Sequence, residues 1–436
     1  MTGQASREGN GRYTWYVVGV LLVVYMVHHL DRMVVTLVLE PIGKEFQLSD
    51  SQLGLLAGMA YAIPFALAGI PLGMLIDRVR RVRLLATLLT VWSGLTALGS
   101  LAGSYWTLVM VRVGVAAAES GGTPANMSII SDYVPPERRS TAFGVYYMGA
   151  QLGTIVGFAV AGAVAAAYGW RAAFLVAGLP GLLLAALVLR TIREPRRGGE
   201  FPGAHAAPAA PPAPPLGTAL RMIAADRIVL HLIIGATIAN VVALGLSTWL
   251  PALLVRSHDA DLRSVGLTIA FGIAPFGALG SLFGGRLGDF IHARGPGGLG
   301  MFLAACAFIT VPAAAFGILS ASTTGLVVAF VVQTFAHVCF VSPCYAAVIG
   351  RVAPETRGLT AAVMQVTSNV IGFGVGAQVI GLGSDLLHDS LGQESLRWAM
   401  FAFCLVNLWA VAHFLRAASL LRHAANQSPG FFAPAR

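Results

Sequence analysis

Two acidic and two basic side chains stand inside otherwise apolar stretches of the sequence. Asp31 and Arg32 fall within an apolar run over residues 15 to 39, and Arg112 and Glu119 fall within another. Each run is long enough to cross a bilayer, because about 20 helical residues span the ~30 Å hydrocarbon core. A charged group that faces lipid costs several kcal/mol, so these four groups are expected to face a protein interior or a polar cavity.

The spacing of these groups along their helices predicts which of them pair. Asp31 lies about seven residues, or ~10 Å, before the predicted outer end of its helix, and Arg112 lies about six residues, or ~9 Å, from the same level. We therefore expect Asp31 and Arg112 to pair. Glu119 lies on the same helix face as Arg112 but ~10.5 Å deeper, near the middle of the membrane and too far for a direct bond along the helix.

Buried carboxyl groups with arginine neighbours are suited to carrying protons. Burial disfavours the ionised form of a carboxyl group, whereas a nearby arginine or water favours it. A group held between these two influences can take up and release a proton. We therefore predict that Asp31, Glu119, Arg112 and Arg32 couple or gate proton movement. A fixed ion-pair network that joins the two helices is the alternative.

Uncharged polar residues and histidines of the spans supply a second set of candidates. His28 precedes Asp31 by about one helical turn and could titrate near neutral pH, but the adjacent His29 could occupy that face instead. Such residues more often bond neighbouring helices than line a cavity. The alternative is that they line a substrate cavity and contact the substrate. The candidates for this cavity are His28, Asn126, Asn240, Gln333, His337, Gln365 and Asn369.

Composition indicates an integral membrane protein built from helices. The 436 residues are 56% hydrophobic and 11% charged, with a mean hydropathy of +0.76, whereas soluble domains carry about 25% charged residues. Long apolar runs recur, without the short alternating segments of a membrane β-barrel. The predicted spans cover residues 16–39, 50–75, 84–103, 106–131, 140–167, 171–191, 228–252, 264–288, 298–319, 325–349, 358–384 and 397–417.

The net charge of +9 is distributed in a way that predicts topology. If both termini are cytoplasmic, 21 of the 28 Lys and Arg residues fall in cytoplasmic segments. This is the positive-inside pattern, so the basic loops are expected to set orientation rather than to bind nucleic acid. We therefore predict a multi-pass protein of a bacterial inner membrane with both termini in the cytoplasm. The four cysteines fall within spans and lack metal-ligand spacing, so no metal is expected.

Repeated motifs indicate that a six-helix unit is used twice in the same orientation. The loop Gly73-Met74-Leu75-Ile76-Asp77-Arg78, after the second span, is echoed by Gly285-Arg286-Leu287-Gly288-Asp289, about 212 residues later. Two further echoes have similar offsets, which is typical of parallel repeats in transporters. An acid among basic residues in a short loop suits a conformational switch, and a loop that only sets topology is the alternative. The switch candidates are Asp77, Arg78, Arg81 and Asp289.

The repeat and the composition together predict the domain organisation. A polar, disordered cytoplasmic tail is expected over residues 1–14, followed by an N-terminal six-helix bundle over 15–192. Residues 193–220 are rich in Pro and Ala and read as a cytoplasmic linker. A C-terminal six-helix bundle is expected over 221–418 and a cytoplasmic tail over 419–436.

Over nearly its whole length the chain resembles the major facilitator superfamily, on the evidence of the two parallel repeats and the loop after the second span. Within that family it looks like the spinster-type transporters. Arg80 stands where the loop commonly has glycine. The segments that carry the spinster resemblance are Leu30-Asp31-Arg32, Leu48-Ser49-Asp50-Ser51-Gln52-Leu53-Gly54-Leu55-Leu56, Arg112 with Glu119-Ser120, and Ile130-Ser131-Asp132-Tyr133-Val134-Pro135-Pro136-Glu137-Arg138-Arg139.

The resemblance implies a fold, a function and roles for particular residues. The fold would be an all-α membrane protein of twelve transmembrane helices in two six-helix repeats. Spinster-type proteins are proton-linked carriers, and their animal members move sphingolipid or lysophospholipid. Asp31, Arg112 and Glu119 would then be the proton-coupling and gating residues.

The sequence thus predicts a proton-coupled secondary transporter that works by alternating access on an amphipathic or anionic organic substrate. An organic-anion/proton symporter and a drug/proton antiporter are the alternatives, and the antiporter is disfavoured because Gly149-Ala150 stands where many antiporters carry Gly-Pro. No catalytic cluster indicates an enzyme. We expect no cofactor beyond the proton gradient. The expected partners are a small-molecule or lipid-like substrate, protons and membrane lipids, with a monomeric protein.

Overall fold

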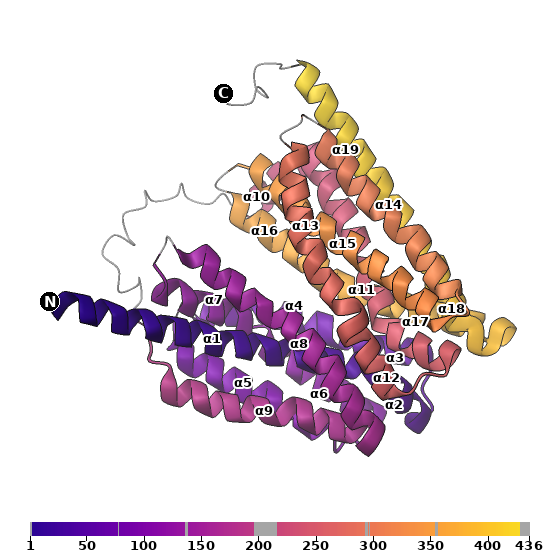
Figure 1. Cartoon of the computed structure of the whole chain (residues 1–436), viewed down its shortest axis with the longest axis horizontal. Helices are drawn as coiled ribbons and strands as arrows, with labels where there is room; N and C mark the ends of the chain where they lie inside the picture. The colour runs from indigo at the N-terminus through magenta and orange to yellow at the C-terminus, as the bar shows by residue number, and fades with distance from the viewer. Residues whose placement is uncertain are drawn as a thin grey trace. The chain divides into compact units, whose positions relative to one another are not determined.

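The computed structural model describes residues 2–76, 78–135, 138–195, 216–292, 295, 297–353 and 356–427, and their regular secondary structure is helical throughout. The chain divides into two compact units. Unit 1 comprises residues 1–48, 60–209 and 261–270, and unit 2 comprises residues 49–59, 210–260 and 271–436. Figure 1 shows the course of the helices from α1 in indigo to α19 in yellow.

Unit 1 is built from helices of the first half of the chain and one short helix of the second half. These helices are α1 Thr2–Leu37, α2 Leu39–Phe46, α4 Ala60–Ile76, α5 Arg81–Gly99, α6 Tyr105–Glu119, α7 Gly122–Tyr133, α8 Arg139–Tyr168, α9 Trp170–Thr191 and α12 Leu262–Leu267. The π-helix η3, Thr268–Ile273, follows α12 directly.

Unit 2 is built from helices of the second half and a short segment of the first. That segment holds α3 Asp50–Gly54 and the π-helix η1 Leu55–Met59. The others are α10 Leu216–Ala225, α11 Arg227–His258, α13 Ala274–His292, α14 Gly298–Leu319, α15 Thr323–Arg351, α16 Arg357–Val366, η5 Thr367–Ile371, α17 Gly372–Leu391, η6 Gly392–Glu394, α18 Ser395–Leu405 and α19 Asn407–Gln427.

The described helices account for the twelve predicted spans. Ten helical stretches are long and apolar enough to cross a membrane. One of them, Gly372–His423, contains the predicted span at 397–417 and the second part of the one at 358–384, whose first part forms α16 and η5. The predicted span at 106–131 is interrupted between Glu119 and Gly122 and forms α6 and α7. The chain is therefore an all-α membrane protein with the twelve-helix arrangement that the sequence predicted.

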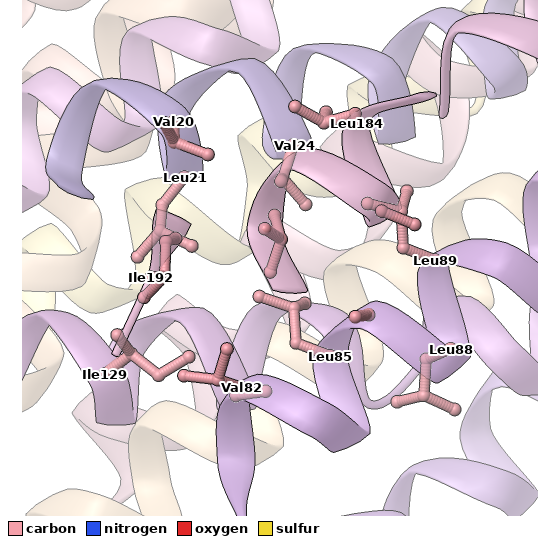
Figure 2. Close-up of a cluster of buried hydrophobic side chains, with 14 of the residues drawn as sticks. Val20, Leu21, Val24, Val82, Leu85, Leu88, Leu89, Ile129, Leu184 and Ile192 are labelled. Carbon is pink, nitrogen blue, oxygen red and sulfur yellow. The ribbon is translucent and has the colours of Figure 1, made fainter. Parts of the chain in front are cut away.

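The core of unit 1 lies where α1, α5, α7 and α9 meet (Figure 2). Leu21, Leu85, Leu89 and Ile129 are fully buried there, and Trp92 is buried beside them. Lipid tails are as apolar as these side chains, so close packing rather than removal from water stabilises the contacts.

Small residues let the longest helices of unit 1 approach closely. α1 and α8 lie side by side along much of their length (Figure 1). A Cβ added to Gly153 would come within 2.3 Å of the Met26 carbonyl oxygen, and one added to Gly149 within 2.5 Å of the Leu22 carbonyl oxygen. A larger side chain at either position would therefore push the helix that carries the proposed proton site away from α8.

The two contact-defined units differ from the two predicted bundles at two segments. Residues 49–59 pack in unit 2 although they belong to the first half of the chain, and residues 261–270 pack in unit 1 although they belong to the second. The predicted bundles were assigned from the order of the spans along the chain. That order could not predict the exchange, because each segment is continuous in sequence with one unit but makes its contacts in the other.

The predicted tails and linker differ in part from the structure. α1 begins at Thr2, so residues 2–14 of the predicted N-terminal tail are helical. α19 continues to Gln427, and α10 includes residues 216–220 of the predicted linker. The remainder of that linker from residue 196, and the tail from residue 428, lie outside the described residues.

Candidate functional site

The first helix extends further than predicted, which changes the depth of Asp31. Val38 N donates to Val34 O at 3.1 Å and Ile42 N donates to Val38 O at 3.2 Å, so α2 continues the hydrogen bonding of α1 as far as Phe46. Asp31 therefore lies 15 residues, or roughly 22 Å, before the end of α2. Glu119 lies 14 residues, or roughly 21 Å, from the start of α6 at Tyr105.

The outer ends of these helices are held at one level. Arg171 donates to both carboxylate oxygens of Glu45, at 2.7 Å each, and also to the Ala102 carbonyl oxygen at 3.1 Å. These bonds, with one from Trp170, hold the pKa of the exposed Glu45 below its ordinary value. Since α2 ends level with the turn before α6, Asp31 and Glu119 lie at similar depth. The prediction that Glu119 lies two turns deeper than Asp31 is wrong.

Asp31 and Glu119 form the centre of a buried polar cluster in unit 1. Their side chains are within hydrogen-bonding reach of each other, and they are 3% and 0% exposed. Thr96 Oγ1 donates to Asp31 Oδ2 at 2.6 Å, and the Tyr61 hydroxyl donates to Glu119 Oε2. His28 Nε2 lies 3.4 Å from the same Glu119 oxygen.

Two arginines surround this carboxyl pair. The guanidinium carbon of Arg32 lies 4.3 Å from the centre of the Tyr61 ring and 5.3 Å from that of Phe65. The guanidinium carbon of Arg112 lies 4.9 Å from the Tyr61 ring. Both arginines are within electrostatic range of Asp31 and Glu119. The four charged groups predicted from the sequence are thus gathered at one place, where Arg32, Arg112 and Glu119 also contact Tyr61.

The arrangement suits a proton that is shared between two acids. Two ionised carboxylates cannot hydrogen bond to each other, because each has only acceptors. No donor of the described residues reaches the buried Glu119 Oε1. A proton on one carboxyl group lets that group donate to the other and removes the repulsion between like charges. Glu119 is the last residue of α6, where the helix is interrupted, so its position depends on that break.

Sequence reasoning missed two members of the cluster. Tyr61 follows η1 and is the first aromatic residue of α4, and Thr96 lies in the buried face of α5. Neither residue is charged, and hydroxyl groups are common in apolar spans, where they often bond their own helix. A polar residue at the same depth as a buried acid was the available signal, but that depth was assigned incorrectly.

The structure distinguishes the two adjacent histidines. His28 is 3% exposed and faces Glu119, whereas His29 is half-buried and its Nδ1 lies 3.4 Å from the Tyr25 carbonyl oxygen. Asn126 Nδ2 donates to the Tyr146 hydroxyl at 3.2 Å, and the Tyr146 ring stacks on Tyr25 at 4.5 Å. His28 therefore belongs to the carboxyl cluster, and Asn126 joins helices beside it.

The polar candidates of unit 2 are not gathered into one site. Asn240 Nδ2 donates to Ala236 O at 2.8 Å and to Ser368 Oγ at 3.4 Å. Gln333 and His337 line a crevice between α11, α14, α15, α18 and α19 that is too narrow for a water molecule. Gln365 is exposed on α16, and Asn369 lies in η5 with its side chain outside the described part of the structure.

Among the switch candidates, Arg81 has a defined structural setting. Its guanidinium lies 2.5 Å from Asp132 Oδ2, donates to Ser128 Oγ at 2.7 Å and is 3.9 Å from Glu194. Glu194 also accepts the backbone N–H groups of Arg81 and Val82, which begin α5. Arg78 and Asp289 are exposed, and Asp77 lies outside the described residues.

A second polar network holds residues 49–59 within unit 2. Arg256 donates to both oxygens of Asp50, at 2.7 and 2.8 Å, and Ser384 Oγ donates to Asp50 at 2.6 Å. Asp385 accepts the backbone N–H groups of Asp50 and Ser51, at 2.8 and 2.9 Å. We call Asp50, Arg256, Ser384 and Asp385 the Asp50 network. A side chain that is bonded at both oxygens by an arginine fork has little freedom to move.

The helix start beside this network carries a side-chain cap. Ser49 accepts from Gln52 N at 3.3 Å, and Gln52 Oε1 accepts from Ser49 N at 2.9 Å, which is a capping box. Gly54 and Gly58 then meet α17 so closely that an added Cβ would lie 2.7 Å from Ala377 O and 2.8 Å from Gly374 O, respectively.

Residues 261–270 have an equivalent setting in unit 1. Asp261 caps α12 by accepting from Arg263 N and Ser264 N, and these bonds lower its pKa. A Cβ added to Gly266 would lie 2.2 Å from the Phe158 carbonyl oxygen of α8. Gly266 follows Gly54 by 212 residues, which is the spacing of the sequence repeat. Each unit therefore holds the equivalent segment from the other half of the chain.

This chain belongs to the Major Facilitator Superfamily, whose sequence profile matches residues 21–377. It is thus a multi-pass membrane protein of a transporter family. In structure it resembles a bacterial homologue of the human lysosomal transporter Spinster, crystallised in an inward-facing and unoccupied conformation. The two share 28% sequence identity with a TM-score of 0.83, over 94% of this chain and 98% of the homologue.

Three relatives from different organisms match this chain over most of its length. An MFS-type efflux pump of Mycolicibacterium smegmatis is 31% identical over 402 residues, which cover 92% of this chain and 91% of the pump. The protein spinster of Drosophila melanogaster is 26% identical over 64% of this chain and 46% of its own length. A probable L-galactonate transporter of Escherichia coli is 26% identical over 66% of each chain.

Proposed function

We propose that this protein is a proton-coupled secondary transporter that moves an amphipathic or anionic organic substrate by alternating access. The observation that carries the proposal is the buried Asp31–Glu119 carboxyl pair, with two arginines around it. The pair can hold a proton in one state and release it in another. Asp31, Glu119, Arg112 and Arg32 are the proton-coupling residues, and Tyr61, Thr96 and His28 position the two acids.

The expected coupling between proton and substrate is electrostatic. When both acids are ionised, they neutralise Arg32 and Arg112, and the cluster has little attraction for an anion. A proton on Asp31 or Glu119 leaves positive charge uncompensated on the arginines. That charge can bind the anionic head of a substrate, whose apolar part would lie along the apolar faces of the spans. Loss of the proton then reverses the attraction and releases the substrate.

Two substrate classes fit this cluster. A lipid-like amphipathic anion is favoured by the structural match to a spinster homologue over 94% of the chain. A sugar acid or another small organic anion is the second candidate, because a probable L-galactonate transporter and a probable sulfoacetate transporter are among the relatives and the site carries two arginines. The similarity to an MFS-type efflux pump also supports an amphipathic substrate.

A proton-flux measurement in liposomes tests this function. The purified protein is reconstituted with an entrapped pH-sensitive dye and offered a lysophospholipid, L-galactonate or the cationic dye ethidium. We expect the lysophospholipid to drive a proton flux that protein-free liposomes lack. A flux driven by L-galactonate alone supports the symporter alternative, and one driven by ethidium alone supports the drug antiporter. Substrate movement that is insensitive to a proton uncoupler contradicts proton coupling.

Alternating access requires that some contacts break in each cycle. We propose that the Asp50 network closes one face of the membrane, and that the switch candidates Asp77, Arg78, Arg81 and Asp289 stabilise the closed state of the other. With both termini in the cytoplasm, the Asp50 network lies on the outer face, because one span separates it from the N-terminus.

Substitution of Asp50 by asparagine is expected to shift the protein toward the state that is open to the outer face. The change removes a charged partner of Arg256, and hydrogen bonds to charged groups contribute about 1.5–3 kcal/mol. Such a loss corresponds to a population shift of roughly 10- to 150-fold. Spin-label distances between the outer ends of α2 and α11 measure the shift.

The matched control for this experiment is Asp259→Asn, a charge removal near the same helix end but outside the network. It is expected to leave the distances unchanged. A wild-type distance distribution in the Asp50→Asn protein would show that the network does not select the access state.

A further inference from the structure

Two histidines of unit 2 form a hydrogen-bonded pair away from the carboxyl cluster. His231 of α11 and His413 of α19 bring their Nδ1 atoms to 2.8 Å, with ring centres 5.0 Å apart. Both side chains are half-buried. In such a bond one Nδ1 carries a hydrogen and the other accepts it, so the outer Nε2 atoms remain available to further partners. One added proton gives a singly charged pair in which both Nε2 atoms donate.

The surroundings of the pair are basic and favour an anion over a metal cation. Arg227 and Arg416 are exposed and within electrostatic range of His231. The nearest acid along α11 is Asp226, which caps the helix and accepts from Arg351 Nε at 2.6 Å. Two arginines beside two histidines repel a cation and attract a negatively charged group.

The four basic residues lie in a graded order of depth. Arg227 begins α11, and His231 lies one turn further in, at about 6 Å. On α19, His413 lies three residues, or about 4.5 Å, from Arg416, and Trp409 lies about 6 Å beyond His413. Trp409 is 60% exposed, and its ring centre lies 5.9 Å from that of His413. Tryptophan below a basic rim is the usual pattern at a membrane interface.

We propose that His231, His413, Arg227 and Arg416 bind the phosphate of an anionic phospholipid, with Trp409 beside the start of its acyl chains. The arginines meet the phosphate at the membrane surface, and the two Nε2–H groups of the protonated histidine pair hold it from below. The occupant is a lipid rather than a free anion, because Trp409 extends the site toward the hydrocarbon. The site lies in unit 2 and does not depend on the proposed transport function.

Binding to this site is expected to take up a proton. The phosphate favours the charged form of the histidine pair, while Arg227 and Arg416 oppose it. Arg221 lies on α10, which packs on α11, and donates to the Gly217 carbonyl oxygen of its own helix. Affinity for an anionic lipid should therefore rise as the pH falls and the histidine pair gains its proton.

Lipid binding to the full-length protein in neutral detergent tests the proposal. Phosphatidylglycerol retained by the protein is counted by native mass spectrometry, with phosphatidylcholine as the neutral comparison. We expect His231→Gln/His413→Gln to lower the affinity for phosphatidylglycerol at least tenfold and to remove its pH dependence. Arg416→Gln, at an exposed position, should weaken binding without removing the pH dependence. His388→Gln, an exposed histidine of α17, is the matched control and should change neither.

Three results would overturn the proposal. Wild-type retention of phosphatidylglycerol in both the histidine and the Arg416 variants would show that the lipid lies elsewhere. Equal retention of phosphatidylcholine would show that the site does not recognise the net negative charge of the phosphatidylglycerol head group. Competition by inorganic phosphate as effective as that by the lipid would identify a site for free anions. The Arg416→Gln variant keeps the test decisive if the double histidine variant does not fold.

Discussion

Glu119→Gln and Asp31→Asn are each expected to abolish transport driven by a pH gradient. Either change removes one of the two groups that can exchange a proton, while the amide keeps the size and part of the hydrogen bonding. Tyr61 can still donate to the side chain at position 119, and Thr96 to the one at position 31. Folding should therefore be preserved. Proton-driven uptake in proteoliposomes is expected to fall to the level of protein-free vesicles.

The same proteins should retain exchange of substrate across the membrane without a gradient, since exchange does not require a change of protonation. Glu45→Gln is the matched control, because Glu45 bonds Arg171 at an exposed helix end, away from the cluster. It is expected to transport at nearly the wild-type rate. If Glu119→Gln and Asp31→Asn also ran at wild-type rates under a pH gradient, the carboxyl pair would be a structural network and the coupling assignment would fail.

Arg112→Ala is expected to do more damage than the loss of either acid. Arg112 is 4% exposed and acts on both Asp31 and Glu119, so its removal leaves two buried acids with less counter-charge. Removing one member of a buried group of opposite charges costs about 3–5 kcal/mol. We expect a lower unfolding temperature as well as the loss of transport. Arg112→Lys should recover stability in part and transport poorly, because a point charge replaces a planar fork of donors.

Thermal unfolding and transport, measured on the same preparations, separate the effect of Arg112→Ala on stability from its effect on transport. Arg263→Ala removes an exposed arginine near the start of α12 and serves as the control; its unfolding temperature should match that of the wild-type protein. An Arg112→Ala protein with wild-type stability and transport would show that Arg112 does not compensate the two acids.

Much of the architecture and the charged members of the site could be predicted from the sequence. Lipid imposes a severe restriction: a span must be apolar, and a charge within it needs a partner. For this reason Asp31, Arg32, Arg112 and Glu119 stood out, and the structure gathers all four in unit 1. The repeat offset of 212 residues, found from the two loop motifs, also separates Gly54 from Gly266, whose close packing the structure shows.

The sequence could not supply the geometry between helices. The depth of Asp31 depended on where its helix ended, and the continuation of α1 into α2 across Val38 placed Asp31 beside Glu119. Tyr61 and Thr96 are ordinary residues of apolar spans until tertiary packing brings them to the acids. The sequence also treated Asn240, Gln333 and His337 as one group, whereas the structure gives Asn240 partners of its own and places the other two on a narrow crevice.

The exchanged segments have a consequence for how the chain matures during synthesis. Unit 1 includes residues 261–270, so its packing around Phe158 and Gly162 of α8 cannot be completed until more than half of the chain has left the ribosome. Residues 49–59 emerge early, but Arg256 and Ser384, their partners, are made far later. During that interval Asp50 has neither of these bonds. The first half of the protein must therefore remain inserted in the membrane with incomplete tertiary packing until the second half has been synthesised.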